Sequence, residues 1–377
     1  VRTLVTDLEE VAKMWQKEME RKNQVQEGTT WNERKRKLIK ERIRRVEEDT
    51  DMQTQIITHP KAVLSWEEFQ KDISSLKNVA PGPHGIGGEV IKKAGVNLQS
   101  ALYEITRRTL ELGVMVERMA EDVVAPVYKR ENPAETSNYR PVSLTDEDNK
   151  IVKKPMKRWM GKWEESTEEG VSPSSFGARK NRDTHMVLVT MKETVLMKVF
   201  RKEKRMVALI VADVTSAFPS LFREGLAAKF LDRGMPEWLF RRWWMTVRRL
   251  DGRIRIGNIS TDLRAHEEGV NQGDVNAAEE WGYYFQDLAD DLQSVPDDQI
   301  VTIKSKDARR PAFLYVDDAS VLVWVTEQQI EMLHSGEGKK EGRKIRVAED
   351  VTKVMRDYAQ ENFLNWAKPK QKVMVFG

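Results

Sequence analysis

The 377-residue sequence contains no cysteine. This absence excludes disulfide bonds and every zinc or iron–sulfur site that relies on cysteine ligands. Histidine is scarce as well, and no two of the five histidines stand at the spacing of a metal-binding pair: His59, His84, His185, His266 and His334. A structural role is therefore expected for each histidine.

Long apolar runs are also missing. No segment approaches the roughly 20 consecutive apolar residues that cross a bilayer, and the N-terminus lacks the apolar core of a signal peptide. With 40% hydrophobic and 33% charged residues, the composition is that of a soluble globular chain. We expect no membrane partner and an intracellular location, in the nucleus or the cytoplasm. The length allows two or three domains, or one large domain with subdomains.

Charge is abundant but nearly balanced, with a formal net charge of +3. Its distribution is uneven, because residues 31–46 carry eight Lys or Arg against two Glu, while residues around 277–298 are acidic. A basic block of this kind is about as typical of a solvated helix face as of a nucleic-acid contact. Charge alone therefore does not name a function.

Apolar periodicity predicts the secondary structure. Helices are expected in residues 1–50 with a break at Gly28, and in 65–76, 89–112, 146–169, 184–203, 221–249 and 327–366, the last with an inserted loop at 335–344. Strands are expected in 122–144 as a pair, 205–214 as a strand buried on both faces, RIRIGN, 308–325 as a hairpin, and KVMVFG. Because helices and strands do not alternate regularly, the fold class is α+β.

Carboxylates stand where two of these predicted elements end. In LYVDDASVLVW, Asp317 and Asp318 form a turn between apolar strands, where a divalent cation would balance their charge. An Asp-Asp pair is also a common turn pair without any ligand. Asp213 ends the apolar run VALIVAD, although an aspartate at this place can equally cap a helix. Three such carboxylates are what a two-metal phosphoryl-transfer site needs, with ions about 3.5–4 Å apart.

A series of further segments accompanies these carboxylates in a fixed order. They are APGPHGIGGEVIK, APVYKR, NYRPVSL, SFGARKNRDT, VADVTSAF, GVNQGD, LYVDDASVL and NWAKPKQKVMVFG. From about residue 60 to the C-terminus, this series resembles the reverse transcriptase domain of the non-LTR (LINE-type) retrotransposon family. Each segment alone is a weak match, but six or more in register over some 300 residues are specific.

The resemblance implies an RNA-directed DNA polymerase that adds dNTPs to a DNA primer on an RNA template. Two Mg²⁺ ions, with Mn²⁺ as a possible substitute, would be held by Asp213, Asp317 and Asp318. The family's nucleotide-contacting positions correspond to Lys129, Arg140, Phe218, Gln272 and Gly273. The two cations would bind the triphosphate, the aromatic ring would exclude a 2′-hydroxyl, and the Gln-Gly pair would allow close backbone approach.

The resemblance also implies a role for a lysine near the end of the chain. Lys370 would donate a proton to the departing pyrophosphate, although an exposed surface lysine flanked by Lys368 and Lys372 is an equal alternative.

The expected architecture is the fingers and palm of a right-hand polymerase, with an antiparallel palm sheet backed by helices and a thumb that is absent or truncated. Residues 1–60 would form a basic helical extension, 61–204 the fingers and 205–377 the palm. Within the extension, the 31–46 helix would contact phosphates, and its apolar residues would dock it onto the fingers: Leu38, Ile39 and Ile43.

Some positions depart from the family pattern. His84 stands where the family usually has Asp, Ser175 where it has Gln, Pro155 interrupts a predicted helix, and Glu279 and Glu280 follow the GVNQGD segment. These departures keep a second hypothesis open, a degenerate domain that binds RNA without catalysis.

A third hypothesis is an RNA-directed RNA polymerase, a class that shares the palm and the paired aspartates. Phe218 and the YVDD form argue against it, since those enzymes more often carry GDD and accept ribose. Metal-dependent primer extension would separate the three.

Overall fold

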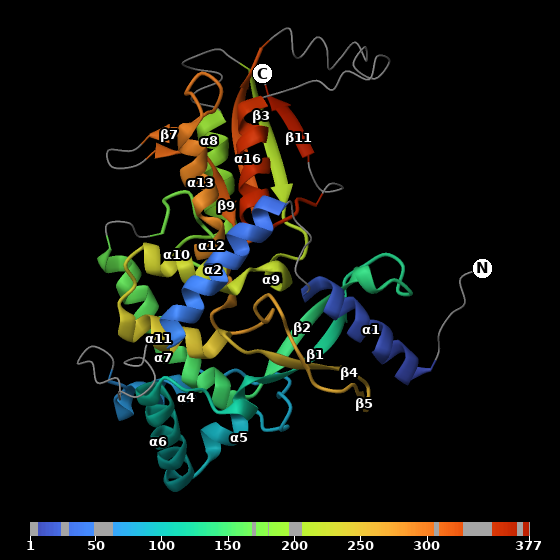
Figure 1. Cartoon of the computed structure of the whole chain (residues 1–377), viewed down its shortest axis with the longest axis vertical. Helices are drawn as coiled ribbons and strands as arrows, with labels where there is room; N and C mark the ends of the chain where they lie inside the picture. Colours follow the sequence, from blue (N-terminus) through green and yellow to red (C-terminus); the bar gives the residue numbers. More distant parts are fainter. Residues whose placement is uncertain are drawn as a thin grey trace. The chain divides into compact units, whose positions relative to one another are not determined.

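The computed structural model describes residues 7–23, 30–48, 63–167, 171–179, 181–195, 206–304, 309–326, 349–367 and 372–376. The chain divides into two compact units (Figure 1). Unit 1 comprises Val1–Glu168 and Phe218–Ala277, and unit 2 comprises Glu169–Ala217 and Ala278–Gly377. Each unit is therefore built from two separate stretches of chain. The division into extension, fingers and palm, drawn from motifs, stays a prediction.

Unit 1 combines helices with a small sheet. Its helices are α1 (Leu8–Asn23), α2 (Thr30–Glu48), α4 (Trp66–Ser74), α5 (Gly88–Lys93), α6 (Val96–Leu112), α7 (Glu147–Ser166), α10 (Arg223–Asp232) and α11 (Glu237–Val247), with 3₁₀ turns η2 (Glu117–Ala120) and η3 (Thr136–Asn138). Its strands are β1 (Glu121–Tyr128), β2 (Tyr139–Thr145), β4 (Asp251–Ile256), β5 (Ile259–Ser260) and β6 (Arg264–Ala265). The short helix α9 (Ala217–Ser220) begins at the boundary between the units.

The sheet of unit 1 has the strand order β2-β1-β4-β5, with β6 also paired to β4. β1 and β2 form the expected antiparallel pair, and β4 lies parallel to β1. Trp15 and Met19 of α1 pack on Val124 of β1 and Ile254 of β4. Since residues two apart on a strand point to the same face, α1 covers the face that also carries Asp122.

The basic helix α2 docks in a different way from that expected. It packs on α10, which lies outside residues 61–204. Ile43 is buried as expected, whereas Leu38 is 66% exposed and does not dock the helix. Arg36 is buried instead, pairs with Glu268, and stacks 4.5 Å above the ring centre of Phe222. The expectation for Leu38 was wrong because Arg36, which the binary pattern assigned to solvent, lies on the buried face of the helix, while Leu38 lies on the exposed face.

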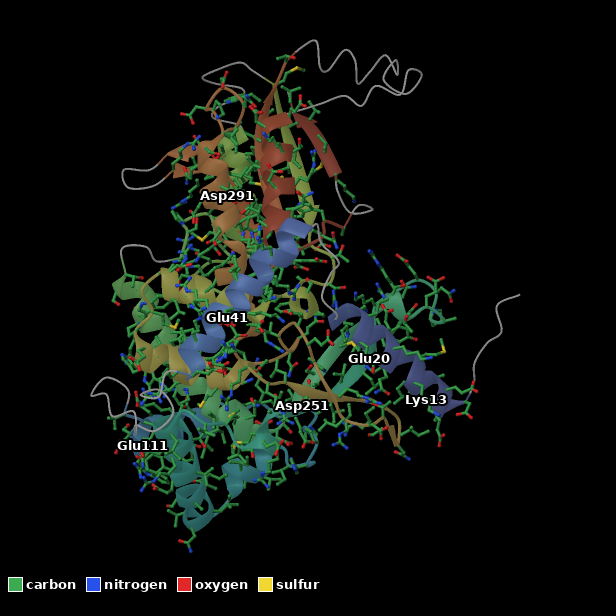
Figure 2. The ribbon with its side chains drawn as sticks, in the orientation of Figure 1. Lys13, Glu20, Glu41, Glu111, Asp251 and Asp291 are labelled. Atoms are coloured by element: carbon green, nitrogen blue, oxygen red, sulfur yellow. The ribbon has the colours of Figure 1, made fainter. Side chains whose placement is uncertain are left out.

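Part of the positive charge of α2 is balanced within the helix. Glu41, labelled in Figure 2, pairs with Arg44 at 2.8 Å and with Arg45 at 3.1 Å. Such exposed pairs contribute little to stability, but they reduce the charge that this helix presents.

Unit 2 is built around an antiparallel sheet of order β11-β3-β10-β9. The strands of unit 2 are β3 (Met206–Asp213), β7 (Ile303–Lys304), β8 (Arg309–Arg310), β9 (Phe313–Tyr315), β10 (Asp318–Val325) and β11 (Lys372–Phe376). Of these, β7 and β8 form a separate two-stranded sheet. Its helices are α8 (Thr184–Val195), α12 (Ala277–Phe285, starting at the boundary), α13 (Asp287–Asp291) and α16 (Glu349–Glu361), with the 3₁₀ turn η5 (Leu292–Ser294).

The core of unit 2 explains why β3 is almost wholly apolar. Val207 and Leu209 pack with Leu322 and Trp324 of β10 in one cluster, which includes Val187 of α8. The alternate β3 residues Ala208, Ile210 and Ala212 are buried as well. Both faces of β3 are therefore covered, as its continuous apolar run predicts.

The α+β class and the antiparallel sheet backed by helices are confirmed. The predicted break at Gly28 and much of the 327–366 segment lie outside the described residues. Pro155 does not interrupt its helix, because α7 runs through it from Glu147 to Ser166. No helix within the described ranges is long and apolar enough to cross a membrane.

Candidate active site

The sheet of unit 2 brings the three aspartates together. Asp213 ends β3 and stands directly opposite Asp318, the first residue of β10. The backbone N–H of Val214 donates to the carbonyl of Asp317 at 3.1 Å. Directly opposed residues in an antiparallel pair have Cβ atoms about 4.5–5.5 Å apart. Register therefore places both sequence-distant carboxylate segments at one end of the sheet.

The turn between β9 and β10 is held in an unusual backbone conformation. Val316 has φ +54°, a region that β-branched residues rarely adopt. The indole N–H of Trp281 donates to the Val316 carbonyl at 2.7 Å. A Cβ on Gly177 would lie 2.5 Å from the Val316 nitrogen, so only glycine fits there. Strain of this type persists where the surroundings impose it. Here the contacts of Trp281 and Gly177 with Val316 fix the turn that carries Asp317.

Trp281 and Gly177 were not predicted as site residues. The Gly of SFGARK and a Trp on the α12 segment carry no local sign that they contact the same turn. A second support comes from the chain after α16, where the N–H of Ala367 donates to the Asp213 carbonyl at 2.7 Å and the N–H of Thr215 donates to the Asn365 carbonyl at 2.8 Å.

The carboxylates interact strongly. Burial raises the pKa of Asp317 to about 6, with further contributions from the charge of Asp213 and, more weakly, of Asp318. The Asp213 and Asp317 side chains are close enough to hydrogen-bond when one of them is protonated. A raised pKa is expected for a buried carboxyl beside other carboxylates.

These side chains could hold a divalent cation, since oxygen ligands and excess negative charge are what Mg²⁺ requires. Asp213 is buried and Asp318 is exposed. Within the described residues, no three His, Asp or Glu side chains are already arranged around a common metal position. The Asp213–Asp317 pair is therefore the part of the set that best fits a cation, and Asp318 stands next to it on β10.

Unit 1 carries the residues expected to contact the nucleotide. Lys129 directly follows β1, and its backbone N–H donates to the Asn138 carbonyl at 2.9 Å. Arg140 is the second residue of β2, opposite Val127. Both side chains are exposed on this hairpin.

The expected Gln-Gly pair contacts β2 of this hairpin. The segment that we name the Gln272 turn (residues 271–275) docks on β2, where the N–H of Ser143 donates to the Gln272 carbonyl at 2.8 Å. Gly273 has φ +109°, and a Cβ there would approach the Ser143 carbonyl oxygen to 3.2 Å. The Gln272 turn therefore docks on the strand that carries Arg140, three residues further along it.

Phe218 belongs to the same unit. Its carbonyl accepts a hydrogen bond of 2.9 Å from Val270, two residues before Gln272. Unit 1 thus gathers Phe218 and the Gln272 turn from motifs more than 50 residues apart. Lys370 lies outside the described residues.

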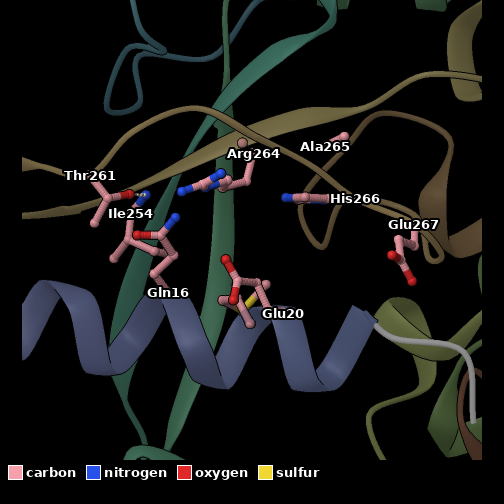
Figure 3. A pocket seen from close by; sticks show the side chains of 10 residues that line it. Gln16, Glu20, Ile254, Thr261, Arg264, Ala265, His266 and Glu267 are labelled. Carbon is pink, nitrogen blue, oxygen red and sulfur yellow. Dashed lines mark hydrogen bonds between the residues drawn. The ribbon is translucent and has the colours of Figure 1, made fainter.

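A cavity of about 240 Å³ lies between α1 and the β4–β6 region of unit 1. Gln16 and Glu20 of α1 face Arg264 and His266 across it (Figure 3). Burial, followed by the charge of Arg223, lowers the pKa of His266 to about 4, so its ring is neutral. None of the residues expected to contact the nucleotide lines this cavity.

A sheet that presents aspartates from a central strand and from a neighbouring hairpin turn is typical of a polymerase palm. The chain belongs to the reverse transcriptase (RNA-dependent DNA polymerase) family, whose family model matches residues 127–375. The match begins within β1, so the APGPHGIGG segment precedes it.

Among solved structures, the chain is similar to an apo telomerase from Candida Tropicalis that is truncated from its C-terminal domain. Identity is 9% and the TM-score is 0.45, over 70% of this chain and 51% of the telomerase chain. The chain therefore spans about half the length of that protein. No curated protein matches the chain.

Proposed function

We propose that this chain is the RNA-directed DNA polymerase domain of a non-LTR retrotransposon-type element. It extends a DNA primer on an RNA template by adding dNTPs. The observation that carries the proposal is the juxtaposition of Asp213 with Asp317 and Asp318 at the end of the β3–β10 pair. The family match supports the polymerase class, and the order of the sequence motifs supports the retrotransposon branch.

The proposed chemistry assigns a role to each group. Asp213, Asp317 and Asp318 would hold two Mg²⁺ ions, or Mn²⁺. When bound, such ions activate the primer 3′-hydroxyl and neutralise the triphosphate. Lys129 and Arg140 bind phosphate oxygens, the former as a point charge and the latter through its planar guanidinium.

The remaining residues select and orient the nucleotide. Phe218 lies under the sugar and excludes a 2′-hydroxyl, while Gln272 and Gly273 let the backbone approach the base pair. Lys370 is the proposed proton donor to pyrophosphate.

Primer extension on an RNA template, with Mg²⁺ or with EDTA, tests the proposal. Loss of one metal ligand removes several kcal/mol of transition-state stabilisation, so Asp213→Asn and Asp317→Asn should each reduce kcat/KM by about 10³-fold or more. Asp357→Asn is the matched control, because Asp357 is an exposed carboxylate on α16 of the same unit. Its activity should stay within about twofold of the wild type.

Two other outcomes would replace the proposal. RNA binding without any metal-dependent extension by the wild-type chain would favour the degenerate RNA-binding domain. Extension with rNTPs as efficient as with dNTPs would favour an RNA-directed RNA polymerase.

A further inference from the structure

The Gln272 turn is a compact loop whose shape is fixed at several points. The N–H of Asp274 donates to the Asn271 carbonyl at 3.0 Å and closes the turn. Gly273 supplies the positive φ, and Ser143 of β2 donates to the Gln272 carbonyl. These contacts orient the turn locally, but each is a single neutral hydrogen bond or a close approach.

Helix α7 adds a charged contact on the other side of this turn. The ammonium of Lys153 donates to one carboxylate oxygen of Asp274, and the two side chains are only 1% and 5% exposed. The second Asp274 oxygen accepts the N–H of Val275 at 2.6 Å. One helical turn further along α7, Lys157 donates to the Val275 carbonyl at 3.2 Å. Two lysines of one helix therefore hold successive residues of the Gln272 turn.

Because this ion pair is buried, each of its two charges depends on the other. A buried ammonium must keep its partner, since removing one member leaves an uncompensated charge away from water. Lys153 also acts on Asp122, a fully buried β1 carboxyl beside Gly252. The pKa of Asp122 is raised to about 7 by burial and by the charge of Asp274, while Ser143 and Lys153 lower it. Displacing Asp274 from Lys153 would thus disturb a cluster that includes β1.

We propose that Lys153 and Lys157 are positioning residues, which fix the Gln272 turn against β2 so that Gln272 and Gly273 are preorganised for the incoming nucleotide. The nucleotide contact of these two residues rests on the proposed function. The positioning itself is a property of unit 1 and does not depend on catalysis. Neither lysine touches the reacting groups; both act through the turn.

Hydrogen exchange in the 377-residue chain tests the positioning directly. The Ser143 amide is protected by the Gln272 carbonyl, so exchange in peptides covering 139–145 reports whether the turn stays docked. Lys153→Met should raise the exchange rate at Ser143 by about tenfold or more. Lys153→Arg keeps the charge and should restore most of the protection.

The control variant is Arg158→Met, on the same helix. Arg158 pairs with the buried Asp72 of α4, so this ion pair joins α7 to α4 instead of to the Gln272 turn. The variant should lower the unfolding midpoint while leaving exchange at Ser143 unchanged. A comparable rise in Ser143 exchange in this control would mean that the effect is general destabilisation, and would overturn the proposal.

A double variant separates stability from positioning. Lys153→Met with Asp274→Leu removes both charges, and apolar replacement of a buried pair commonly restores stability. The unfolding midpoint should recover, while the Ser143 amide stays exposed to exchange. If the unfolding midpoint and the protection of the Ser143 amide both recover, the Lys153–Asp274 ion pair only stabilises the fold.

Primer-extension kinetics connect the turn to function. A turn that binds nucleotide less well should raise KM for dNTP about tenfold in Lys153→Met while kcat changes little, the sign of weakened uniform binding. If the wild type does not extend primers but Lys153→Met loses Ser143 protection, the proposed function fails and the positioning stands. If Ser143 protection and KM are both unchanged, the positioning fails. Should Lys153→Met not fold, Lys157→Gln at the exposed end gives the same two readouts.

Discussion

The carboxylate cluster of unit 2 should destabilise the metal-free protein, and removing one charge should reveal it. In the absence of a cation, Asp317 is half-buried beside Asp213. Asp317→Asn keeps nearly the same shape but carries no charge. We therefore expect this variant to be more stable than the wild type in EDTA, even though it should lose activity.

The size of this effect follows from the pKa of Asp317. A value of about 6, against about 3.9 for a free aspartate, corresponds to at most about 3 kcal/mol at neutral pH. A carboxyl with a raised folded-state pKa binds a proton that the unfolded chain releases, so the free energy of unfolding falls as pH rises from about 4 to about 6. Asp317→Asn should therefore gain about 1–3 kcal/mol at pH 7.5 and no more than about 0.5 kcal/mol at pH 4.

Urea unfolding followed by circular dichroism, in EDTA at both pH values, measures this difference. Asp357→Asn serves as the control, because its exposed carboxylate should show no comparable gain. Mg²⁺ at ten times its dissociation constant should stabilise the wild type by about 1.4 kcal/mol and the Asp317→Asn variant much less. A variant that is less stable than the wild type at pH 7.5 in EDTA would refute the reasoning, since the carboxylate would then be stabilising.

Three further results are expected. Phe218→Val should raise the rNTP-to-dNTP ratio of kcat/KM by at least about tenfold with a smaller loss in dNTP use; an unchanged ratio would make Phe218 a core residue. His266→Gln should remove up to about 3 kcal/mol of the destabilisation that the wild type shows as pH falls from 6.5 to 4, because His266 binds a proton in the unfolded chain at a pH where it stays neutral in the folded chain. If the urea midpoints of the variant and the wild type fall equally over this pH range, His266 does not contribute to acid destabilisation. Replacing Arg34, Lys35 and Lys37 of α2 with Gln should reduce the slope of log K for template binding against log salt by about 0.7 for each phosphate contact that is lost. Arg36→Gln should instead chiefly lower stability. A salt titration of the triple variant measures the slope, and an unchanged slope would mean that these three side chains face water.

Much of the carboxylate site could be predicted from local sequence, because each aspartate stands at the end of a segment whose secondary structure the sequence itself indicates. The apolar run before Asp213 predicts a buried strand, and the VDD turn between apolar runs predicts a hairpin. Antiparallel pairing of the two then requires that the strand end and the hairpin turn meet. The pairing of Asp213 with Asp318 is therefore consistent with sequence reasoning, although the roles of these residues stay predictions.

Contacts between distant segments could not be predicted in this way. Trp281 and Gly177 meet at Val316 although more than 100 residues separate them. Arg36 occupies an interior position that a charge pattern assigns to solvent, because its partner Glu268 lies more than 200 residues away. A binary pattern records what one segment prefers, and it contains no information about a partner that changes that preference.

The two charged clusters of the chain differ in one respect that matters for function. Around Lys153, the buried carboxylate of Asp274 pairs with an ammonium that belongs to the protein and cannot leave, so the ion pair fixes a conformation. Around Asp317, carboxyls lie together at the end of a sheet, and burial, followed by the charge of Asp213, raises the pKa of Asp317. A carboxylate site can bind a cation from solution and release it in each catalytic cycle, whereas a site that is neutralised by a lysine of the protein cannot. The first arrangement suits a surface that must stay in place, and the second suits chemistry on phosphates.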